Sequence, residues 1–227
     1  ALTTNYRHKI EKKEDLSVQD VVDAFVTSFD ERSPDTEFLS SEVPDDLKKT
    51  GVQMVKEYQT VVAPKIKPVA TQKYYNVKFP NVDWTLKGIA DVEEENGAIR
   101  DNKTSGKSPS KNANGEYMPY SDDHKFQMLC YSISEKMDKG NTAGEELWLD
   151  YAIKNKYPKI IQVKVPSPTP EDLKYFQMLT SIAVRKIELL KKGTLPALPN
   201  RGNMLCSKKY CGYWALCEKD FGGTVKN

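Results

Sequence analysis

The order in which the hydrophobic period changes along the chain constrains the fold more than any other feature. Apolar residues recur at helical spacing in residues 17–30 and 44–62, and each segment opens with a residue typical of a helix start. The pattern then changes to valine, tyrosine and isoleucine alternating with polar residues in 69–79, 84–93 and 97–104. Helices followed by three strands are therefore predicted.

The second half of the chain continues this alternation. A polar loop at 105–119 precedes a helix at 120–137, strands at 146–154 and 159–165 follow, and a long helix then ends at Gly193. The residues predicted to form the core side of the middle helix are Phe126, Leu129, Cys130, Ile133 and Met137. This order predicts an α/β fold with a central mixed β-sheet flanked by helices.

Composition excludes two classes of protein. Of the 227 residues, 38% are hydrophobic and 29% charged, and no apolar run approaches the roughly 18 residues that a membrane span requires. The net charge of +2 is uneven, because residues 1–60 carry 13 acidic and 8 basic side chains. The basic excess downstream fits either a solvated surface or a face that binds a polyanion. The chain is neither disordered nor membrane-embedded.

One predicted hairpin, residues 85–104, carries two aspartates and a lysine. A two-residue turn at Asn96-Gly97 would place Asp91 opposite Asn102, whereas a three-residue loop of 95–97, with Gly97 in the left-handed conformation, places Asp91 opposite Asp101. The sequence permits both turns. We favour the three-residue loop because it brings two carboxylates onto one face, where a cation would relieve their repulsion.

Paired carboxylates of this kind suit Mg²⁺ or Mn²⁺, which prefer oxygen ligands. Asp101 and Lys103 point to the same face of their strand, so an ammonium group would lie beside the metal, where it can act on a metal-bound water. Considered alone, an Asp-x-Lys sequence is more often a surface salt bridge. The neighbouring motifs favour the metal site.

Three motifs together resemble the RecB-type branch of the PD-(D/E)XK nucleases: G-x-x-D at 88–91, D-x-K-T at 101–104 and Q-x-x-x-Y at 127–131. The resemblance implies a restriction-endonuclease-like core in which Asp91, Asp101 and the backbone carbonyl of Asn102 bind the metal and Lys103 is catalytic. It assigns Gln127 and Tyr131 to positioning the site and the nucleic acid. The candidate DNA contacts are Thr104, Lys107 and Lys111.

The C-terminal tail carries a second signal. Cys206, Cys211 and Cys217 are similar to the three-cysteine element of iron–sulfur nucleases of this branch, whose fourth cysteine precedes the core, so the resemblance implies a 4Fe–4S cluster. Zinc ligation and simple packing of free thiols are the alternatives. The chain begins at Ala1 without an initiator methionine, so we expect further residues upstream that could supply the fourth ligand.

The chain departs from the family pattern at several points. The metal-binding histidine that usually follows a glycine on an early helix is absent, and both His8 and His124 are expected to be surface residues. Gln72 stands where the family often has a glutamate, and Cys130 is expected to pack in the core rather than bind metal. The gaps near the start fit the expectation of further residues upstream, and the resemblance covers residues 69–217 well and residues 1–68 only in their general helical character.

The resulting hypothesis is a cytoplasmic, Mg- or Mn-dependent DNA exonuclease of recombination or repair, from a phage or mobile element. The expected partners are DNA and a single-strand annealing protein, with no membrane. The expected divisions are an N-terminal helical part (1–66), the nuclease core (67–193) and a Cys-rich tail (194–227). The alternatives are a non-catalytic nucleic-acid-binding module with a structural metal in the tail, or a nuclease fold kept as an interaction scaffold.

Overall fold

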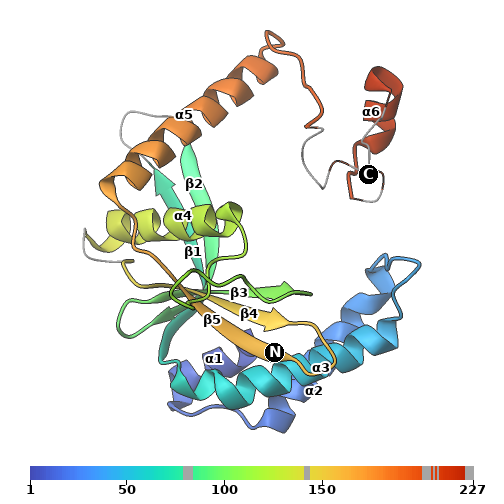
Figure 1. Ribbon diagram of the computed structural model, residues 1–227, viewed down its shortest axis with the longest axis vertical. Coiled ribbons are helices and arrows are strands. Elements are labelled where there is room, and N and C mark those ends of the chain that lie inside the picture. Colours follow the sequence, from blue (N-terminus) through green and yellow to red (C-terminus); the bar gives the residue numbers. More distant parts are fainter. Residues whose placement is uncertain (79–83, 141–143, 201–205, 207, 209, 223–227) are drawn as a thin grey trace. The chain divides into compact units, whose positions relative to one another are not determined.

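A five-stranded mixed sheet forms the centre of the computed structural model, which describes residues 1–78, 84–140, 144–200, 206, 208 and 210–222 (Figure 1). The strands lie side by side in chain order, with β3 and β4 parallel and every other neighbouring pair antiparallel. They are β1 (Pro68–Lys78), β2 (Thr85–Glu94), β3 (Ile99–Ser105), β4 (Leu147–Ile153) and β5 (Lys159–Val165). The mixed sheet predicted from the sequence is confirmed.

Within residues 1–173, helices pack against both faces of this sheet. The helices are α1 (Leu2–Lys12), α2 (Val18–Arg32), α3 (Pro44–Val61), α4 (Asp122–Lys139), α5 (Pro170–Lys191) and α6 (Trp214–Phe221). Short 3₁₀ turns occupy Ser33–Asp35 and Ala63–Lys65. The predicted N-cap of α2 is confirmed, because the Ser17 side chain accepts a hydrogen bond from the Asp20 N–H. Helix α6 was not predicted.

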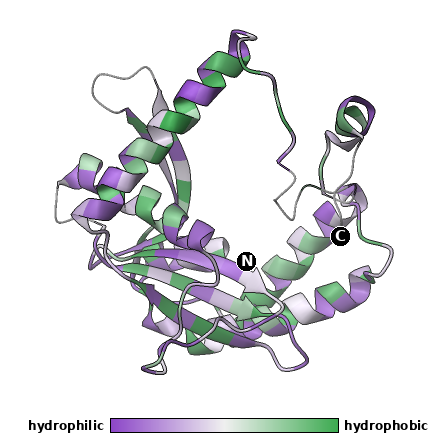
Figure 2. Cartoon of the chain, turned by 45° about the horizontal axis from the view of Figure 1, so that its top comes forward, coloured by the Kyte–Doolittle hydropathy of each residue, from purple (hydrophilic) through white to green (hydrophobic). Residues whose placement is uncertain are grey.

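Two hydrophobic clusters, one on each face, hold the layers together. Tyr6 of α1 and Tyr58 of α3 pack with Val92 on one face, and Met128 and Tyr131 of α4 pack with the central strands on the other. Hydrophobic and hydrophilic residues alternate along the strands and around the helices (Figure 2). This alternation is what a sheet buried on both faces by amphipathic helices requires.

The core side of α4 agrees with the prediction only in part. Leu129 and Ile133 are buried as predicted, Met128, Tyr131, Ser132 and Glu135 are buried as well, and Met137 is 42% exposed. The buried set has helical spacing but mixes apolar and polar side chains, because Tyr131 and Glu135 form buried hydrogen bonds. A prediction based on hydrophobicity alone therefore finds Leu129 and Ile133 but misses the buried polar residues of this helix.

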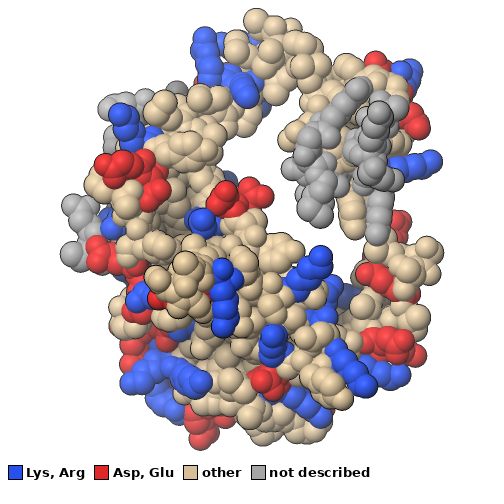
Figure 3. Space-filling model, in the orientation of Figure 1, with Lys and Arg blue, Asp and Glu red and all other residues tan. Residues whose placement is uncertain are grey.

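The chain divides into two compact units, residues 1–173 and 174–227. The first contains the sheet with α1–α4, and the second contains most of α5 together with α6. Among the residues that the structure describes, every helix is too short or too polar to cross a bilayer. On the face shown in Figure 3, Lys and Arg side chains are interspersed with Asp and Glu and form no single broad patch.

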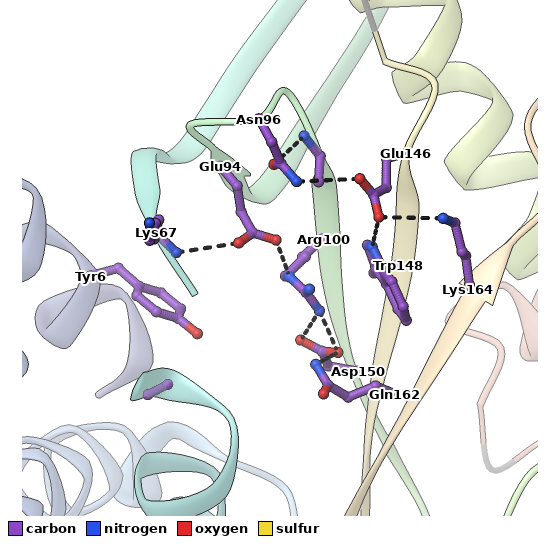
Figure 4. Close-up of polar contacts among 12 residues, drawn as sticks. Tyr6, Lys67, Glu94, Asn96, Arg100, Glu146, Trp148, Asp150, Gln162 and Lys164 are labelled. Carbon is purple, nitrogen blue, oxygen red and sulfur yellow. Dashed lines mark hydrogen bonds and ion pairs between the residues drawn. The ribbon is translucent and has the colours of Figure 1, made fainter. Parts of the chain in front are cut away.

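A buried polar network joins the sheet to the helices on the α1–α3 face. Arg100 of β3 lies between two acids, with its Nε 2.5 Å from Glu94 Oε1 and its Nη1 3.1 Å from Asp150 Oδ1 (Figure 4). Tyr58 donates a 3.0 Å hydrogen bond to Asp150 and accepts one of 2.9 Å from Tyr6. The network therefore connects β2, β3, β4, α3 and α1 through side chains alone.

Candidate active site

The hairpin that carries the candidate site has the predicted register. Val92 pairs with Arg100 and Glu93 with Ile99, which is the alignment that a three-residue loop produces. Gly97 has a φ of 80°, and its N–H donates to the Glu94 carbonyl. The left-handed conformation favours glycine at this position, because a side chain would be strained there. The predicted turn is confirmed.

Strands β2 and β3 separate just beyond these pairs, at Asp91. A continuing ladder would pair Asn102 with Ala90, but the Asn102 N–H donates instead to Asp91 Oδ2 at 2.8 Å. The Asp91 carboxylate thus lies in the gap between the strands. The register predicted from the sequence placed it directly opposite Asp101, so this detail of the prediction is wrong. Because the N–H and C=O of a strand residue point to the same side, the Asn102 carbonyl also faces this gap.

Asp101, Lys103 and Gln127 form a closed set of contacts on the α4 side of the gap. Lys103 Nζ lies 2.5 Å from Asp101 Oδ2 and 2.7 Å from Gln127 Oε1. The Gln127 amide donates to Asp101 Oδ1 at 3.1 Å. Burial raises the pKa of Asp101 and the charge of Asp91 raises it further, while the hydrogen bond from Lys103 lowers it. A cation at this position therefore stabilises the ionised carboxylate.

Tyr131 connects this set to β2. Its hydroxyl accepts a 2.7 Å hydrogen bond from Gln127 and donates one of 2.6 Å to the Ile89 carbonyl. Burial, with the charge of Asp101, raises the pKa of Tyr131 to about 12, so the hydroxyl keeps its proton at neutral pH. A Cβ on Gly88 would lie 3.3 Å from the Tyr131 ring, which explains the glycine of the G-x-x-D motif.

Enlarging Gly88 should therefore disturb the site through Tyr131. We expect Gly88→Ala to lower kcat/KM by less than tenfold and Gly88→Val by about 10²-fold, since displacements approaching 1 Å have effects of that size. Steady-state kinetics on DNA measures both. Gly106→Val is the matched control, because a Cβ on Gly106 meets no atom within 4 Å. Equal activity of the two Gly88 variants and the wild type would contradict this account.

Gln72 contacts the candidate site in a way that the sequence did not reveal. Its amide donates a 2.8 Å hydrogen bond to Asp91 Oδ1, and the neighbouring Thr71 hydroxyl donates to the Asp91 carbonyl. Gln72 has a φ of 53°, a conformation that costs a non-glycine residue about 1–3 kcal/mol. Position 72, where the family often has glutamate, therefore supplies an amide that orients Asp91.

His124 is not the surface residue that the sequence suggested. It is half-buried in the first turn of α4, where its Nδ1 lies 2.7 Å from the Tyr151 hydroxyl. Burial lowers the pKa of His124, and the nearby Lys103 lowers it further. His8 is also half-buried, and its Nε2 lies 3.9 Å from Glu14 Oε1. His124 thus borders the candidate site through Lys103 and Tyr151.

The candidate DNA contacts lie at the end of β3 and in the following loop. Thr104, Lys107 and Lys111 are all exposed. Lys111 Nζ lies 4.6 Å from the centre of the Tyr117 ring, and the two residues form an isolated antiparallel bridge. Their positions leave them free to contact a substrate, and their role in binding DNA stays a prediction.

Comparison with known proteins decides the family. The model of the PD-(D/E)XK nuclease superfamily matches residues 2–218, which is nearly the whole chain. This chain belongs to the PD-(D/E)XK nuclease superfamily. No match was found among curated proteins.

Two solved structures are similar to this superfamily member. One is the "Putative exonuclease" of Eubacterium rectale, with 14% identity, a TM-score of 0.52, and coverage of 81% of this chain and 71% of that chain. The other is SSO0001, with 16% identity, a TM-score of 0.40 and coverage of 95% of both chains. At these identities only the first supports a conclusion, and that conclusion is the shared restriction-endonuclease-like fold.

The donor set fits the divalent metal that PD-(D/E)XK nucleases typically use. Within the described ranges no three His, Cys, Asp or Glu side chains come together as a metal-binding group. Two carboxylates, Asp91 and Asp101, and the Asn102 carbonyl nevertheless border one gap, and all three donors are oxygens. Mg²⁺ and Mn²⁺ are held by few protein oxygens, with water and substrate completing the coordination. The site therefore suits such an ion.

The cysteines do not form a comparable site. Cys206, Cys211 and Cys217 line one hollow of about 670 Å³ together with apolar residues such as Trp214 and Phe221. The same described residues contain no group of thiols placed to bind a metal. Cys130 is partly buried on α4, and burial raises the pKa of its thiol to about 11, as expected for a packing residue. No catalytic role follows from the cysteines.

Proposed function

We propose that this PD-(D/E)XK superfamily member is a Mg- or Mn-dependent deoxyribonuclease of the RecB-like branch that removes nucleotides from the ends of DNA. The observation that carries the proposal is the position of Lys103, whose ammonium group is held by Asp101 and Gln127 beside the gap that contains Asp91. A binding module needs basic groups but has no use for two carboxylates next to them.

Each residue has a distinct task in this proposal. Asp91, Asp101 and the Asn102 carbonyl would hold the ion, which when bound supplies Lewis acidity and activates water. Lys103 places a positive charge where negative charge develops at the phosphorus. Gln127 fixes the positions of the Lys103 ammonium and the Asp101 carboxylate at once, so neither group has to reorganise as the reaction proceeds.

A DNA digestion assay tests the function. Linear and circular DNA, each single- and double-stranded, are incubated with Mg²⁺, with Mn²⁺ and with EDTA. We expect metal-dependent loss of linear DNA and intact circles, because an exonuclease needs an end. Cleavage of the circles would indicate an endonuclease. Binding without cleavage under all metal conditions would favour the non-catalytic binding module instead.

The three tail cysteines are the subject of a separate proposal, a 4Fe–4S cluster or zinc, which is supported by their spacing in the sequence, since the described thiols do not come together as a metal-binding group. Protein that also carries a fourth ligand should, when purified without oxygen, contain roughly four irons or one zinc per chain, whereas this chain, with three tail cysteines, should be colourless or hold a labile metal. Metal analysis by mass spectrometry measures both. A metal-free preparation of a protein that still degrades DNA would reject this proposal and leave the nuclease proposal intact.

A further inference from the structure

Strands β1 and β2 extend beyond the rest of the sheet as a two-stranded arm, defined here as Lys73–Lys78 with Thr85–Ala90 (Figure 1). Their pairing continues to Lys78 and Thr85, whereas among the described residues β2 pairs with β3 only at Val92 and Glu93. The arm therefore projects past the point where the strands separate, which is the candidate active site.

One face of the arm is covered and the other is bare. On the covered face, Tyr75 and Ala90 belong to the core cluster that includes α4. The bare face consists of three cross-strand pairs whose members are all exposed: Tyr74–Ile89, Asn76–Lys87 and Lys78–Thr85. Tyr74 is 57% and Ile89 is 49% exposed. A tyrosine ring on an isolated strand pair is thus presented to solvent beside two lysines.

The composition of this bare face points to one class of partner. It contains two lysines, an aromatic ring and two neutral polar side chains, and no acid, although acids and bases are nearly equal in number in the whole chain. Lysines suit phosphate groups, and exposed aromatic rings stack with unpaired bases. With Ile89 as its one aliphatic side chain, the face is too polar for a typical protein interface core.

The bare face also leads directly to the candidate catalytic group. On the same face, the next residues after Tyr74 and Ile89 are Gln72 and Asp91, and these two are joined by a 2.8 Å hydrogen bond. A strand lying on the face would therefore reach the Asp91 carboxylate. Side chains two residues apart on a strand are separated by about 6.6 Å, so Tyr74 and Asn76 would meet successive parts of the same strand.

We propose that the bare face of the β1–β2 arm binds single-stranded DNA and guides it to Asp91, with Tyr74 stacking on a base and Lys87 and Lys78 contacting phosphates. The inference rests on the proposed nuclease function and specifies the substrate form that the enzyme handles. A duplex offers no unpaired base to Tyr74, so the interaction selects an unpaired strand.

Binding measured without cleavage tests this inference. Fluorescence anisotropy with a labelled single-stranded oligonucleotide in EDTA gives Kd for the whole protein. We expect Tyr74→Ala to raise Kd by about 5- to 100-fold, the range for loss of one stacked base, and Tyr74→Phe to leave it near the wild-type value. Because Tyr74 is largely exposed, thermal unfolding should show an unchanged Tm for both variants.

The salt dependence of the affinity for single-stranded DNA tests the role of Lys87. Lys87→Ala should reduce the slope of log K against log salt by about 0.7, the value for one phosphate contact on a single strand. Lys49→Ala is the matched control, because the Lys49 side chain is 75% exposed on α3, away from the arm, and should leave the slope unchanged. Equal slopes for the wild type and both variants would overturn the assignment of Lys87.

The outcomes separate this inference from the proposed function. If the wild type degrades DNA and Tyr74→Ala binds single strands as tightly as the wild type does, the arm assignment is wrong and the nuclease stands. If the wild type binds single strands through Tyr74 but never cleaves them, the arm assignment stands and the nuclease proposal fails. An equal loss of affinity for a matched duplex would overturn the stacking role.

Discussion

Lys103→Ala is expected to lower the rate of the cleavage step by about 10²-fold or more while leaving DNA binding nearly unchanged. The reason is that Asp101 and Gln127 hold the ammonium group in place before any substrate arrives. Lys103→Arg should not restore the rate, because a planar guanidinium cannot occupy the position of a compact ammonium. Single-turnover kinetics with saturating Mn²⁺ measures the step.

The companion variant Asp101→Ala should fail for a different reason. It removes one of two carboxylates, and the remaining Asp91 holds Mg²⁺ poorly against its hydration shell. Calorimetric titration with Mn²⁺ should therefore show lost metal binding in Asp101→Ala and retained binding in Lys103→Ala. Lys49→Ala, on α3, controls for the loss of a lysine. Wild-type cleavage rates in Lys103→Ala would reject its catalytic role.

Arg100→Met is expected to lower the free energy of unfolding by about 3–5 kcal/mol, the usual effect of removing one partner of a buried ion pair. Asp150, which is 1% exposed, would lose its cation, so its ionised form would be buried without an opposite charge. Urea unfolding measures the change. The double variant Arg100→Met/Asp150→Leu should recover only part of the loss, because it removes the unpaired charge of Asp150 but leaves Glu94 without its cation. Additive losses in the double variant would contradict the coupling.

The Arg100→Met effect should also depend on pH. Burial raises the pKa of Asp150, and the charge of Arg100 opposes this rise, so the variant should raise the pKa of Asp150 further. When the pKa of a carboxyl is higher in the folded state than in the unfolded state, the group lowers the free energy of unfolding. This destabilisation is complete at pH values above the folded-state pKa and absent at pH values below the unfolded-state pKa. The destabilisation should therefore shrink as pH falls from 7 towards 4. A constant loss across this range would exclude Asp150 as the cause.

Local patterns explain why much of the site was predictable. The register of the hairpin follows from the length of the loop that ends in Gly97, and two residues on the same strand, such as Asp101 and Lys103, necessarily share a face. Gln127 and Tyr131 lie one helical turn apart and therefore on the same side of α4. Both reach the site once α4 packs over β3. These relations depend on short stretches of sequence.

The remaining features depend on contacts between distant residues. The Arg100–Asp150 pair joins positions on two strands that the sequence does not show to be neighbours. Gln72 orients Asp91 only because its backbone adopts a left-handed conformation, which nothing in its sequence context signals. His124 approaches Lys103 because β3 and β4 are parallel and place Tyr151 beside Lys103. Hydrophobic periodicity carries no information about such polar contacts.

The parallel pairing of β3 with β4 also has a consequence for the order of folding. The β2–β3 hairpin joins residues close in sequence, whereas β4 can pair with β3 only after the long segment between Ser105 and Leu147 has crossed the sheet. Pairings with large sequence separation form slowly, because loop-closure entropy is lost before their contacts are gained. We therefore expect Asp91 and Asp101 to come together early and Gln127, carried on the crossing segment, to complete the candidate site late.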